Sequence, residues 1–396
     1  MSYRLRSLLT NIGALALIVG AFVLISNTRT GSPLTATAPG PALEQSAQTA
    51  ASAITGTSTN VATTSPAVAP KKAPPQTNAP EKSNNAATNE ASPRAQSQQT
   101  PTSTVARIQD PYSFPPLSFD VINTSTRMAL VNILCMPQNG SLRPISGSGV
   151  IIDPRGVILT NAHVAQYVLL SESPQVDLSC FIRDGSPAAA HWRATVLYIP
   201  PAWVEVHASD IKVARPTGTG EYDYALLLIS DSLDGSPLPA FSYLPVDTRE
   251  GVAFLDDQIL AGSYPAEFLG GIAAQYNLYS ASSVTTIKQL LTFSSGTIDL
   301  LSLGGIIEAQ SGSSGGAVVN AWGHLVGIIS TTSEGDTTAD RDLRAISLSY
   351  IDRSIAADNG FDLRALLAGD VAAEATDFKA RFSMRLTDFL ITQIQN

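Results

Sequence analysis

Short apolar runs separated by turn residues fill the middle of the chain, from Leu117 to Tyr350. The segments 192–198, 253–260 and 317–329 are examples, in a region where Gly, Pro, Asp and Ser mark the turns. Short strands at this spacing, with no long amphipathic helices between them, are typical of an antiparallel sandwich or barrel. The pattern therefore predicts an all-β domain, to which we assign residues 110–358.

Local patterns within this region predict individual strands. Two apolar runs, 147–152 and 156–160, flank a turn at 153–156 and predict a β-hairpin. The run 224–229 is apolar throughout, as expected for a strand that is buried on both faces. We interpret residues 344–350 as the closing strand of the domain.

The pattern changes in the last part of the chain, residues 359–396. Helix-forming residues occupy 361–394, and from Ala372 onward the apolar ones recur at a spacing close to that of an amphipathic helix. We expect a helix that packs on the second half of the β domain. A helix for membrane-surface binding or self-association is the alternative, although its polar face lacks the basic excess that interfacial helices prefer.

The N-terminus begins with a largely apolar segment, residues 8–25, that follows Arg4 and Arg6. At ~1.5 Å per residue, a helix over this run approaches the ~30 Å of a hydrocarbon core. We therefore expect residues 1–26 to form an uncleaved transmembrane signal anchor. The alternative is a cleaved signal peptide, whose nearest cleavage match lies at 36–38. The two arginines predict a cytoplasmic N-terminus and an extracytoplasmic chain beyond the helix, in the periplasm or outside the cell.

Composition separates the apolar segment from the β domain. Residues 27–109 consist mainly of Ala, Thr, Ser, Pro, Gln and Asn and contain almost no aromatic residues. Such a segment cannot bury enough apolar surface to offset its ordering entropy, so we predict a disordered stalk. The whole chain carries a formal net charge of -9 and no dense Lys/Arg cluster, which argues against a nucleic-acid partner.

The candidate chemistry lies in three motifs that follow one another as His, Asp and Ser. They are 160–164 with His163, 223–227 with Asp223, and 312–316 with Ser314. A serine hydroxyl is a poor nucleophile at neutral pH, so acyl-transfer enzymes place a histidine base beside it and a buried carboxylate behind the histidine. Ser314 is therefore the candidate nucleophile.

Glycines around Ser314 allow the backbone to turn its N–H groups toward one point, as an oxyanion hole requires. We expect Gly312, Ser313 and Ser314 to form this hole, with the amides of Gly312 and Ser314 as donors. The same segment also fits the Gly-x-Ser-x-Gly elbow of α/β-hydrolases. That fold needs its histidine well downstream, whereas only His324 follows Ser314 and it lies in a predicted strand.

Together with Ser146-Gly147-Ser148-Gly149, the three motifs resemble those of trypsin-like (chymotrypsin-fold) serine proteases, nearest to the bacterial high-temperature-requirement type. The resemblance spans roughly residues 117–352. It implies two six-stranded antiparallel β-barrels, at about 117–235 and 250–352, with a connection around 231–250 and the active site between them.

The same resemblance implies roles for individual residues: His163 as general base, Asp223 as its orienting partner and Ser314 as nucleophile. The expected activity is that of a serine endopeptidase that hydrolyses protein or peptide substrates through an acyl-enzyme intermediate. No cofactor is expected. The four histidines show no metal-binding spacing, so no metal site is expected either. The alternative is a catalytically inactive relative that binds an envelope partner through the same cleft.

The sequence departs from the family pattern in several places. Ser313 stands where enzymes activated by cleavage have an acid, and no Ile-Val-Gly-Gly start occurs, so we expect no activation salt bridge. Ala317 replaces the usual proline, and we expect no PDZ domain because the remaining residues are too few for one. Glu308 precedes Ser314 at a spacing where some relatives hold an acid that selects Lys or Arg, but we interpret it as a solvated side chain.

The chain's two cysteines, Cys135 and Cys180, flank the histidine motif. Trypsin-like enzymes often have a disulfide near their histidine, although this spacing differs from the usual one. A disulfide between them is expected outside the cytoplasm, where thiols are not held reduced. The alternative is two buried free thiols.

Overall fold

A computed structural model describes most of the chain from Val105 onward. The described residues are 105–138, 142–213, 218–267, 275–293, 296–333, 335 and 337–395. All of them belong to the compact unit 88–396. The predicted signal anchor, 1–26, and the predicted stalk up to residue 104 lie outside the described residues. Within the described part of the chain, no helix is long and apolar enough to cross a membrane.

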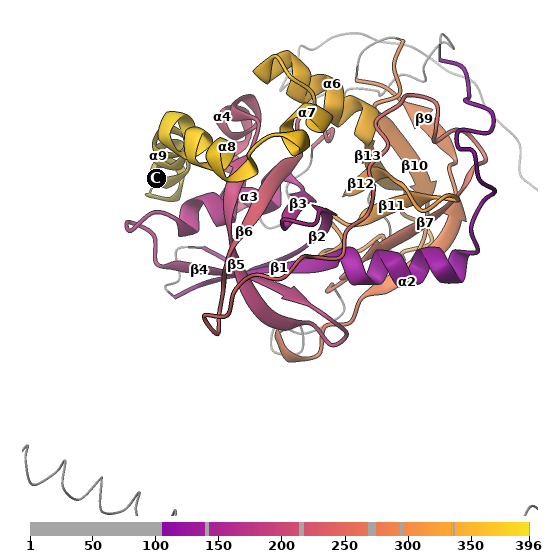
Figure 1. Ribbon diagram of the computed structural model, residues 1–396. Coiled ribbons are helices and arrows are strands. Elements are labelled where there is room, and N and C mark those ends of the chain that lie inside the picture. The colour runs from indigo at the N-terminus through magenta and orange to yellow at the C-terminus, as the bar shows by residue number, and fades with distance from the viewer. Residues whose placement is uncertain are drawn as a thin grey trace, which may run out of the picture. The chain divides into compact units, whose positions relative to one another are not determined.

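The first half of the domain is a closed antiparallel barrel (Figure 1). The order around the barrel is β1 (Leu130–Pro137), β2 (Ile145–Asp153), β3 (Val157–Thr160), β6 (Ala225–Ser232), β5 (Ala189–Tyr198) and β4 (Leu178–Asp184). The predicted hairpin is present as β2 and β3. The predicted apolar strand is present as β6, whose residues from Ala225 to Ile229 are buried. The six-stranded first barrel is thus confirmed.

The second half differs from the predicted six-stranded barrel, because it is an open sheet of seven strands. Its order is β8 (Ala281–Thr286), β7 (Gln258–Ser263), β11 (Ala317–Asn320), β12 (Leu325–Thr332), β13 (Leu343–Ser347), β10 (Leu300–Gly304) and β9 (Gln289–Leu291). The edge strands β8 and β9 follow each other in the chain with only Ile287 and Lys288 between them. The chain therefore bends where one continuous strand would close a barrel.

The predicted closing strand, 344–350, ends earlier than expected. β13 stops at Ser347, whose hydroxyl accepts a hydrogen bond from the Tyr350 amide and caps helix α6 (Leu348–Asn359). Gly360 ends this helix with a φ of 76°, which glycine adopts without steric cost.

The C-terminal segment is a series of helices, where we expected one. It consists of α7 (Leu363–Ala368), α8 (Val371–Phe378), a π-helical turn (Lys379–Ser383) and α9 (Met384–Gln395). These helices pack on the first barrel and on α3 (Ala162–Ser171) and α4 (Pro201–His207), as Figure 1 shows. Phe378 contacts Tyr198 of β5, for example, with ring centroids 6.0 Å apart. The expected packing on the second barrel is therefore wrong.

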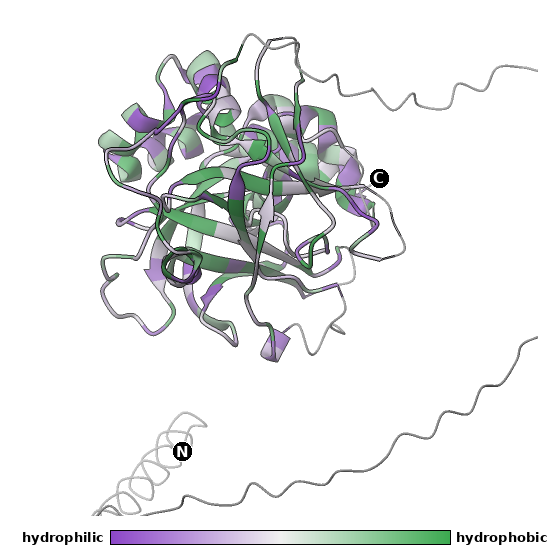
Figure 2. Cartoon of the chain, turned by 90° about the vertical axis from the view of Figure 1, so that its right-hand side faces the viewer, coloured by the Kyte–Doolittle hydropathy of each residue, from purple (hydrophilic) through white to green (hydrophobic). Residues whose placement is uncertain are grey.

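Hydrophobic residues lie along most strands of both halves, and the helices carry hydrophobic and hydrophilic residues together (Figure 2). A helix that was not predicted, α2 (Phe119–Ala129), precedes β1 and packs on β7, β11 and β2.

The described chain also begins inside the predicted stalk, 27–109. The Ile108 amide donates to Gly251 O at 3.0 Å, and Val105 and Ile108 pack against the core of the second sheet. Residues 105–109 are therefore part of the folded domain, because two apolar side chains interrupt the polar composition there.

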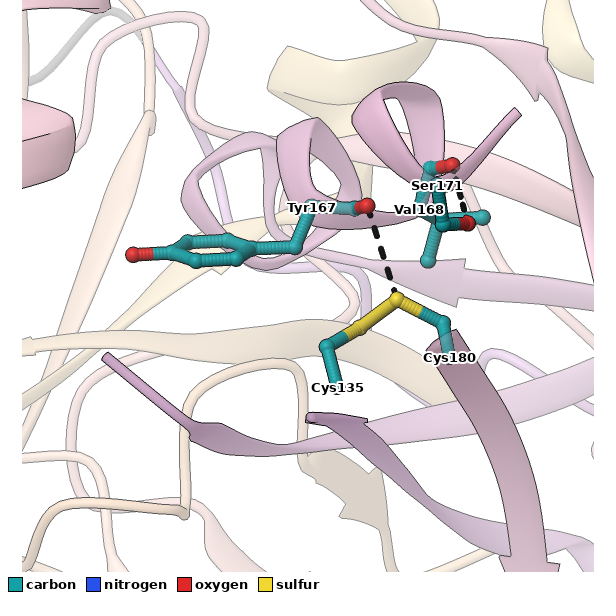
Figure 3. Close-up of a disulfide and its surroundings, with 5 residues drawn as sticks. All are labelled: Cys135, Tyr167, Val168, Ser171 and Cys180. Atoms are coloured by element: carbon teal, nitrogen blue, oxygen red, sulfur yellow. Dashed lines mark hydrogen bonds between the residues drawn. A yellow bond between two sulfur atoms is a disulfide. The ribbon is translucent and has the colours of Figure 1, made fainter. Parts of the chain in front are cut away.

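Cys135 and Cys180 form a disulfide between neighbouring strands. They are direct partners in the antiparallel pairing of β1 with β4. Figure 3 shows the bridge beneath α3, where Cys180 Sγ lies 3.4 Å from Tyr167 O. The predicted pairing is thus present, and the alternative of two free thiols is wrong. The disulfide supports the helix whose first turn contains His163.

Candidate active site

His163 is the second residue of α3 and follows closely on the end of β3 at Thr160. Asn161 lies between them in an extended conformation, with φ -86° and ψ 154°. Its side chain does not cap the helix but donates to the backbone oxygen of Asp223 at 2.8 Å. The residue that starts the helix thus also joins the histidine and aspartate segments.

Asp223 lies just before β6, at the end of a turn in which Gly220 and Tyr222 both have positive φ. Asp223 is buried, with 5% of its surface exposed to solvent. One carboxylate oxygen accepts from the His163 amide at 3.0 Å, and the other lies 2.8 Å from His163 Nδ1. Since a carboxylate only accepts, Nδ1 carries the proton and Nε2 is left as the basic nitrogen. Ser330 Oγ donates a further hydrogen bond to Asp223, at 2.8 Å.

The pair shifts both pKa values toward the charged forms. Burial alone would lower the pKa of His163, but the negative charge of Asp223 and the hydrogen bond to it raise this pKa above the ordinary 6.5. Burial alone would raise the pKa of Asp223, but the charge and hydrogen bonds of His163, together with Ser330, hold this pKa below the ordinary 3.8. The imidazole is thus more basic than a free histidine.

Ser314 lies in the loop between β10 and β11, next to two glycines that the loop geometry requires. Gly312 has a φ of 96° and Gly315 a φ of 85°. A Cβ at Gly315 would lie 2.0 Å from Ser148 O, so a side chain there would displace the loop from the first barrel. The Gly-rich sequence is therefore explained by close backbone approach as well as by conformation.

Ser148 of β2 fastens this loop to the first barrel. Its amide donates to Ser314 O at 2.7 Å, and its hydroxyl donates to Gly312 O at 2.7 Å while accepting from the Tyr264 amide at 2.9 Å. Its own backbone oxygen accepts from Thr160 Oγ1 at 2.7 Å. The sequence motif 146–149 contains Ser148 but does not by itself predict this role.

Strand β12 fastens the loop from the other side. The Gly315 amide donates to Ile329 O, and the Ile329 amide donates to Gly316 O, each at 2.8 Å. The next residue, Ser330, donates to Asp223. The structure therefore brings His163 and Asp223 into direct contact. The two strands that hold the Ser314 loop, β2 and β12, also contact the segments of these residues, through Thr160 and Asp223 respectively.

The three residues predicted for the oxyanion hole differ in the state of their amides. The Ser313 amide donates to Gln310 O at 3.2 Å, so it is not available as a donor. In the part of the chain that the structure describes, the amides of Gly312 and Ser314 donate to no protein acceptor. The Ser313 side chain is buried and its hydroxyl accepts from Ser263 Oγ at 3.0 Å. An uncharged pair thus occupies the position beside the nucleophile.

Glu308 differs from the solvated side chain that we expected. It is 0% exposed, and its Oε1 accepts from Ser283 Oγ of β8 at 3.0 Å. Burial raises the pKa of this carboxyl above its ordinary range. The interpretation as a solvated residue is therefore wrong, and burial favours a neutral side chain here.

The structure thus holds the ring of His163 on a buried aspartate and fastens the glycine-rich loop of Ser314 to strands of both antiparallel β halves. Residues 147–328 match the family model of the trypsin-like peptidase domain. Residues 147–328 therefore form a trypsin-like peptidase domain, which supports a serine protease.

Comparison with solved structures includes one serine endoprotease, from Yersinia pestis. The similarity has 21% sequence identity and a TM-score of 0.38, and it covers 63% of this chain and 70% of that one. None of the curated proteins matches the chain.

Proposed function

We propose that the protein is a membrane-anchored, extracytoplasmic serine endopeptidase with Ser314 as nucleophile, His163 as general base and Asp223 as the residue that orients the base. The observation that carries the proposal is the contact between Asp223 and both the ring and the amide of His163. This contact fixes the imidazole with its basic Nε2 free to take a proton, which is the arrangement that activates a serine.

The reaction proceeds in two halves. Ser314 Oγ attacks the scissile carbonyl carbon as His163 Nε2 takes the hydroxyl proton, and the carbonyl oxygen becomes an oxyanion. The amides of Gly312 and Ser314 donate to that oxyanion. His163 then gives its proton to the leaving amine, which departs and leaves an acyl-enzyme. Water, deprotonated by His163, attacks the ester carbonyl and releases the acid and Ser314.

The test is labelling of residues 105–396, produced as a soluble protein, with a fluorescent fluorophosphonate. We expect one covalent adduct on Ser314, located by peptide mass spectrometry, and cleavage of a fluorogenic peptide library. Ser314→Ala should abolish the adduct and reduce turnover by several orders of magnitude, with about 10³-fold acceleration over water left by binding and the oxyanion hole. Ser311→Ala, in the same loop, is the matched control and should still be labelled.

A native protein that ignores the probe yet captures a partner reproducibly would favour the inactive binding scaffold instead. Full proteolysis by Ser314→Ala would refute the assignment of the nucleophile.

The membrane part of the proposal rests on the apolar segment 8–25 and the preceding Arg4 and Arg6. A reporter fused behind residue 109 should be active only outside the cytoplasm, and the full chain should sediment with membranes and resist carbonate extraction. A soluble chain that starts near Pro39 would show that the segment is a cleaved signal peptide.

A further inference from the structure

The direction of the first oxyanion donor is set by residues outside the loop of Ser314. Gly312 N–H belongs to the same peptide unit as the carbonyl of Ser311, and in a trans peptide the two groups point in opposite directions. The Ser311 carbonyl accepts from the Ala266 amide at 2.8 Å. The position of Ala266 thus determines where Gly312 N–H points.

An ion pair between Glu267 and Arg341 contacts the segments on both sides of the hydrogen bond between Ala266 and Ser311. Arg341 Nη1 lies 2.7 Å from Glu267 Oε2, and Arg341 Nη2 lies 3.1 Å from Oε1, so the contact is bidentate. Glu267 Oε2 also accepts from the Ser311 amide at 3.2 Å. Arg341 Nη1 donates in addition to Ala309 O at 2.8 Å. Both side chains are mostly buried, 13% exposed for Arg341 and 16% for Glu267.

These contacts join three segments without regular secondary structure. Glu267 follows β7, Ala309 and Ser311 belong to the loop before β11, and Arg341 lies shortly before β13. Arg341 Nε also donates to Gly335 O at 3.1 Å, within its own segment. A guanidinium can satisfy this set because it presents five donors in a rigid fork, whereas an ammonium cannot reproduce it.

The energetic weight of the pair exceeds that of an ordinary surface ion pair. Exposed pairs contribute little because water screens them and the side chains lose entropy on pairing. Here the fork is bidentate and mostly removed from water, and each of its three nitrogens donates to an acceptor, which is the arrangement in which charge-assisted hydrogen bonds are strong. Loss of either charge would leave the other partner buried without its counter-charge.

We propose that the Glu267–Arg341 pair is a positioning pair for the oxyanion hole, holding the Ala266 amide on the Ser311 carbonyl so that Gly312 N–H faces the reacting carbonyl. The inference rests on the proposed function of Ser314. Neither residue touches substrate; both act through Ser311.

The experiment compares the variants Glu267→Gln, Glu267→Ala, Arg341→Lys and Arg341→Gln with the unsubstituted protein. The control is Arg249→Gln, which breaks a bidentate pair with Asp247 and a bond to Pro111 O in another part of the second half. For each protein we would measure the second-order rate of fluorophosphonate labelling from pH 5 to 9, kcat and KM on a cleaved library peptide, and the thermal midpoint of unfolding.

We expect Glu267→Ala and Arg341→Gln to lower the labelling rate and kcat by about 10- to 100-fold, less than the cost of removing an oxyanion donor outright. KM and the midpoint of the acidic limb, which depends on His163 and Asp223, should stay unchanged. Glu267→Gln retains an oxygen acceptor and Arg341→Lys retains the charge, so both should give intermediate rates. Arg249→Gln should keep the full labelling rate, although its thermal midpoint should fall by an amount similar to that of the Glu267 and Arg341 variants.

Equal labelling rates in all folded variants would overturn the inference while leaving Ser314 as the nucleophile. A shifted acidic limb or a loss confined to KM would also overturn it, because either would mean an effect on the His163–Asp223 pair or on substrate binding. Failure of the unsubstituted protein to label would refute the proposed function itself.

Discussion

Replacing Asp223 with asparagine tests the electrostatic arrangement of the site with almost no change in shape. The carboxylate accepts from the His163 amide, from His163 Nδ1 and from Ser330. An asparagine has one oxygen acceptor in place of two, and its NH₂ group can only donate. If the NH₂ faces Nδ1, that nitrogen must accept, and the ring proton moves to Nε2, where it blocks removal of the serine proton.

The expected loss is large and depends on pH. In a trypsin-like triad this change lowers kcat by about 10⁴-fold, equivalent to about 5.5 kcal/mol of transition-state stabilisation. The charge and hydrogen bond of Asp223 are also what raise the pKa of His163 above 6.5. With both removed, burial alone remains and lowers that pKa. The acidic limb of activity should therefore lie above pH 6.5 in the native enzyme and below pH 6.5 in Asp223→Asn.

The assay is the fluorophosphonate labelling rate between pH 4.5 and 9, with unfolding by urea followed at each pH. The pKa shifts of His163 and Asp223 change the folding stability with pH in opposite directions. The raised pKa of His163 gives stability that is present below pH 6.5 and is lost as pH rises through the folded pKa. The lowered pKa of Asp223 gives stability that is present above pH 3.8 and is lost as pH falls through the folded pKa.

Ser330→Ala is the control for this experiment, because it removes one hydrogen bond and leaves the charge. Its acidic limb should stay close to that of the native enzyme. If Asp223→Asn labels within 10-fold of the native rate at pH 8, or keeps the native limb, then Asp223 does not orient the base and the reasoning from its contacts to His163 is wrong.

Four other outcomes follow from contacts described above. Ser148→Ala removes a buried hydroxyl that both donates and accepts, so it should lower the free energy of unfolding by about 1–3 kcal/mol in urea titrations and slow labelling; unchanged labelling would show that the loop holds its shape alone. Replacing Cys135 and Cys180 with alanine removes a bridge across a sequence separation of 45, so the free energy of unfolding should fall by about 2–4 kcal/mol in the same titrations. Reduced native protein should be as unstable as the double variant. The raised pKa of Glu308 gives the native protein stability that is lost as pH rises through that pKa. The stability of Glu308→Gln relative to the native protein should therefore be higher at pH 8 than at pH 4, and identical pH profiles of the two proteins would argue against a buried neutral acid. A blocking tag in front of residue 105 should leave labelling unchanged before and after its removal, and labelling that appears only after a cut would mean that a new N-terminus orders the site.

Local motifs predicted the parts of the site that depend on short stretches of chain. The hairpin of β2 and β3 ends beside His163, and the apolar strand β6 begins beside Asp223, so the sequence indicated where both side chains emerge. The contact between them followed from the family resemblance. The cross-strand disulfide was expected on the basis of compartment and position near the histidine, and the register of β1 with β4 explains it.

Features that depend on packing between distant segments could not be predicted in this way. The apolar face of the C-terminal helices indicated that they pack, but not that they pack on β5 and α3. Glu308 was assigned to solvent because a lone carboxylate is usually exposed, and only the fold brings Ser283 to it. Glu267 and Arg341 are separated by 74 positions and lie in segments with no periodic pattern, so nothing in the sequence marks them as partners.

The uncharged Ser313 and the Glu267–Arg341 ion pair are two parts of the same structural arrangement around Ser314. Ser313 is buried against Ser263 and has no charge with which to attract a freed amine. The orientation of the adjoining peptide units must then come from carbonyl partners within the domain: Ala266 for Ser311, Ser148 for Gly312 and the Gly316 amide for Ser313. Two of these partners come from segments that are far from the loop in the chain, and only the first needs an ion pair to stay in place. We therefore expect an oxyanion hole built on such contacts to be complete once both halves of the domain have folded, because each contact is formed by folding and none requires a cut in the chain.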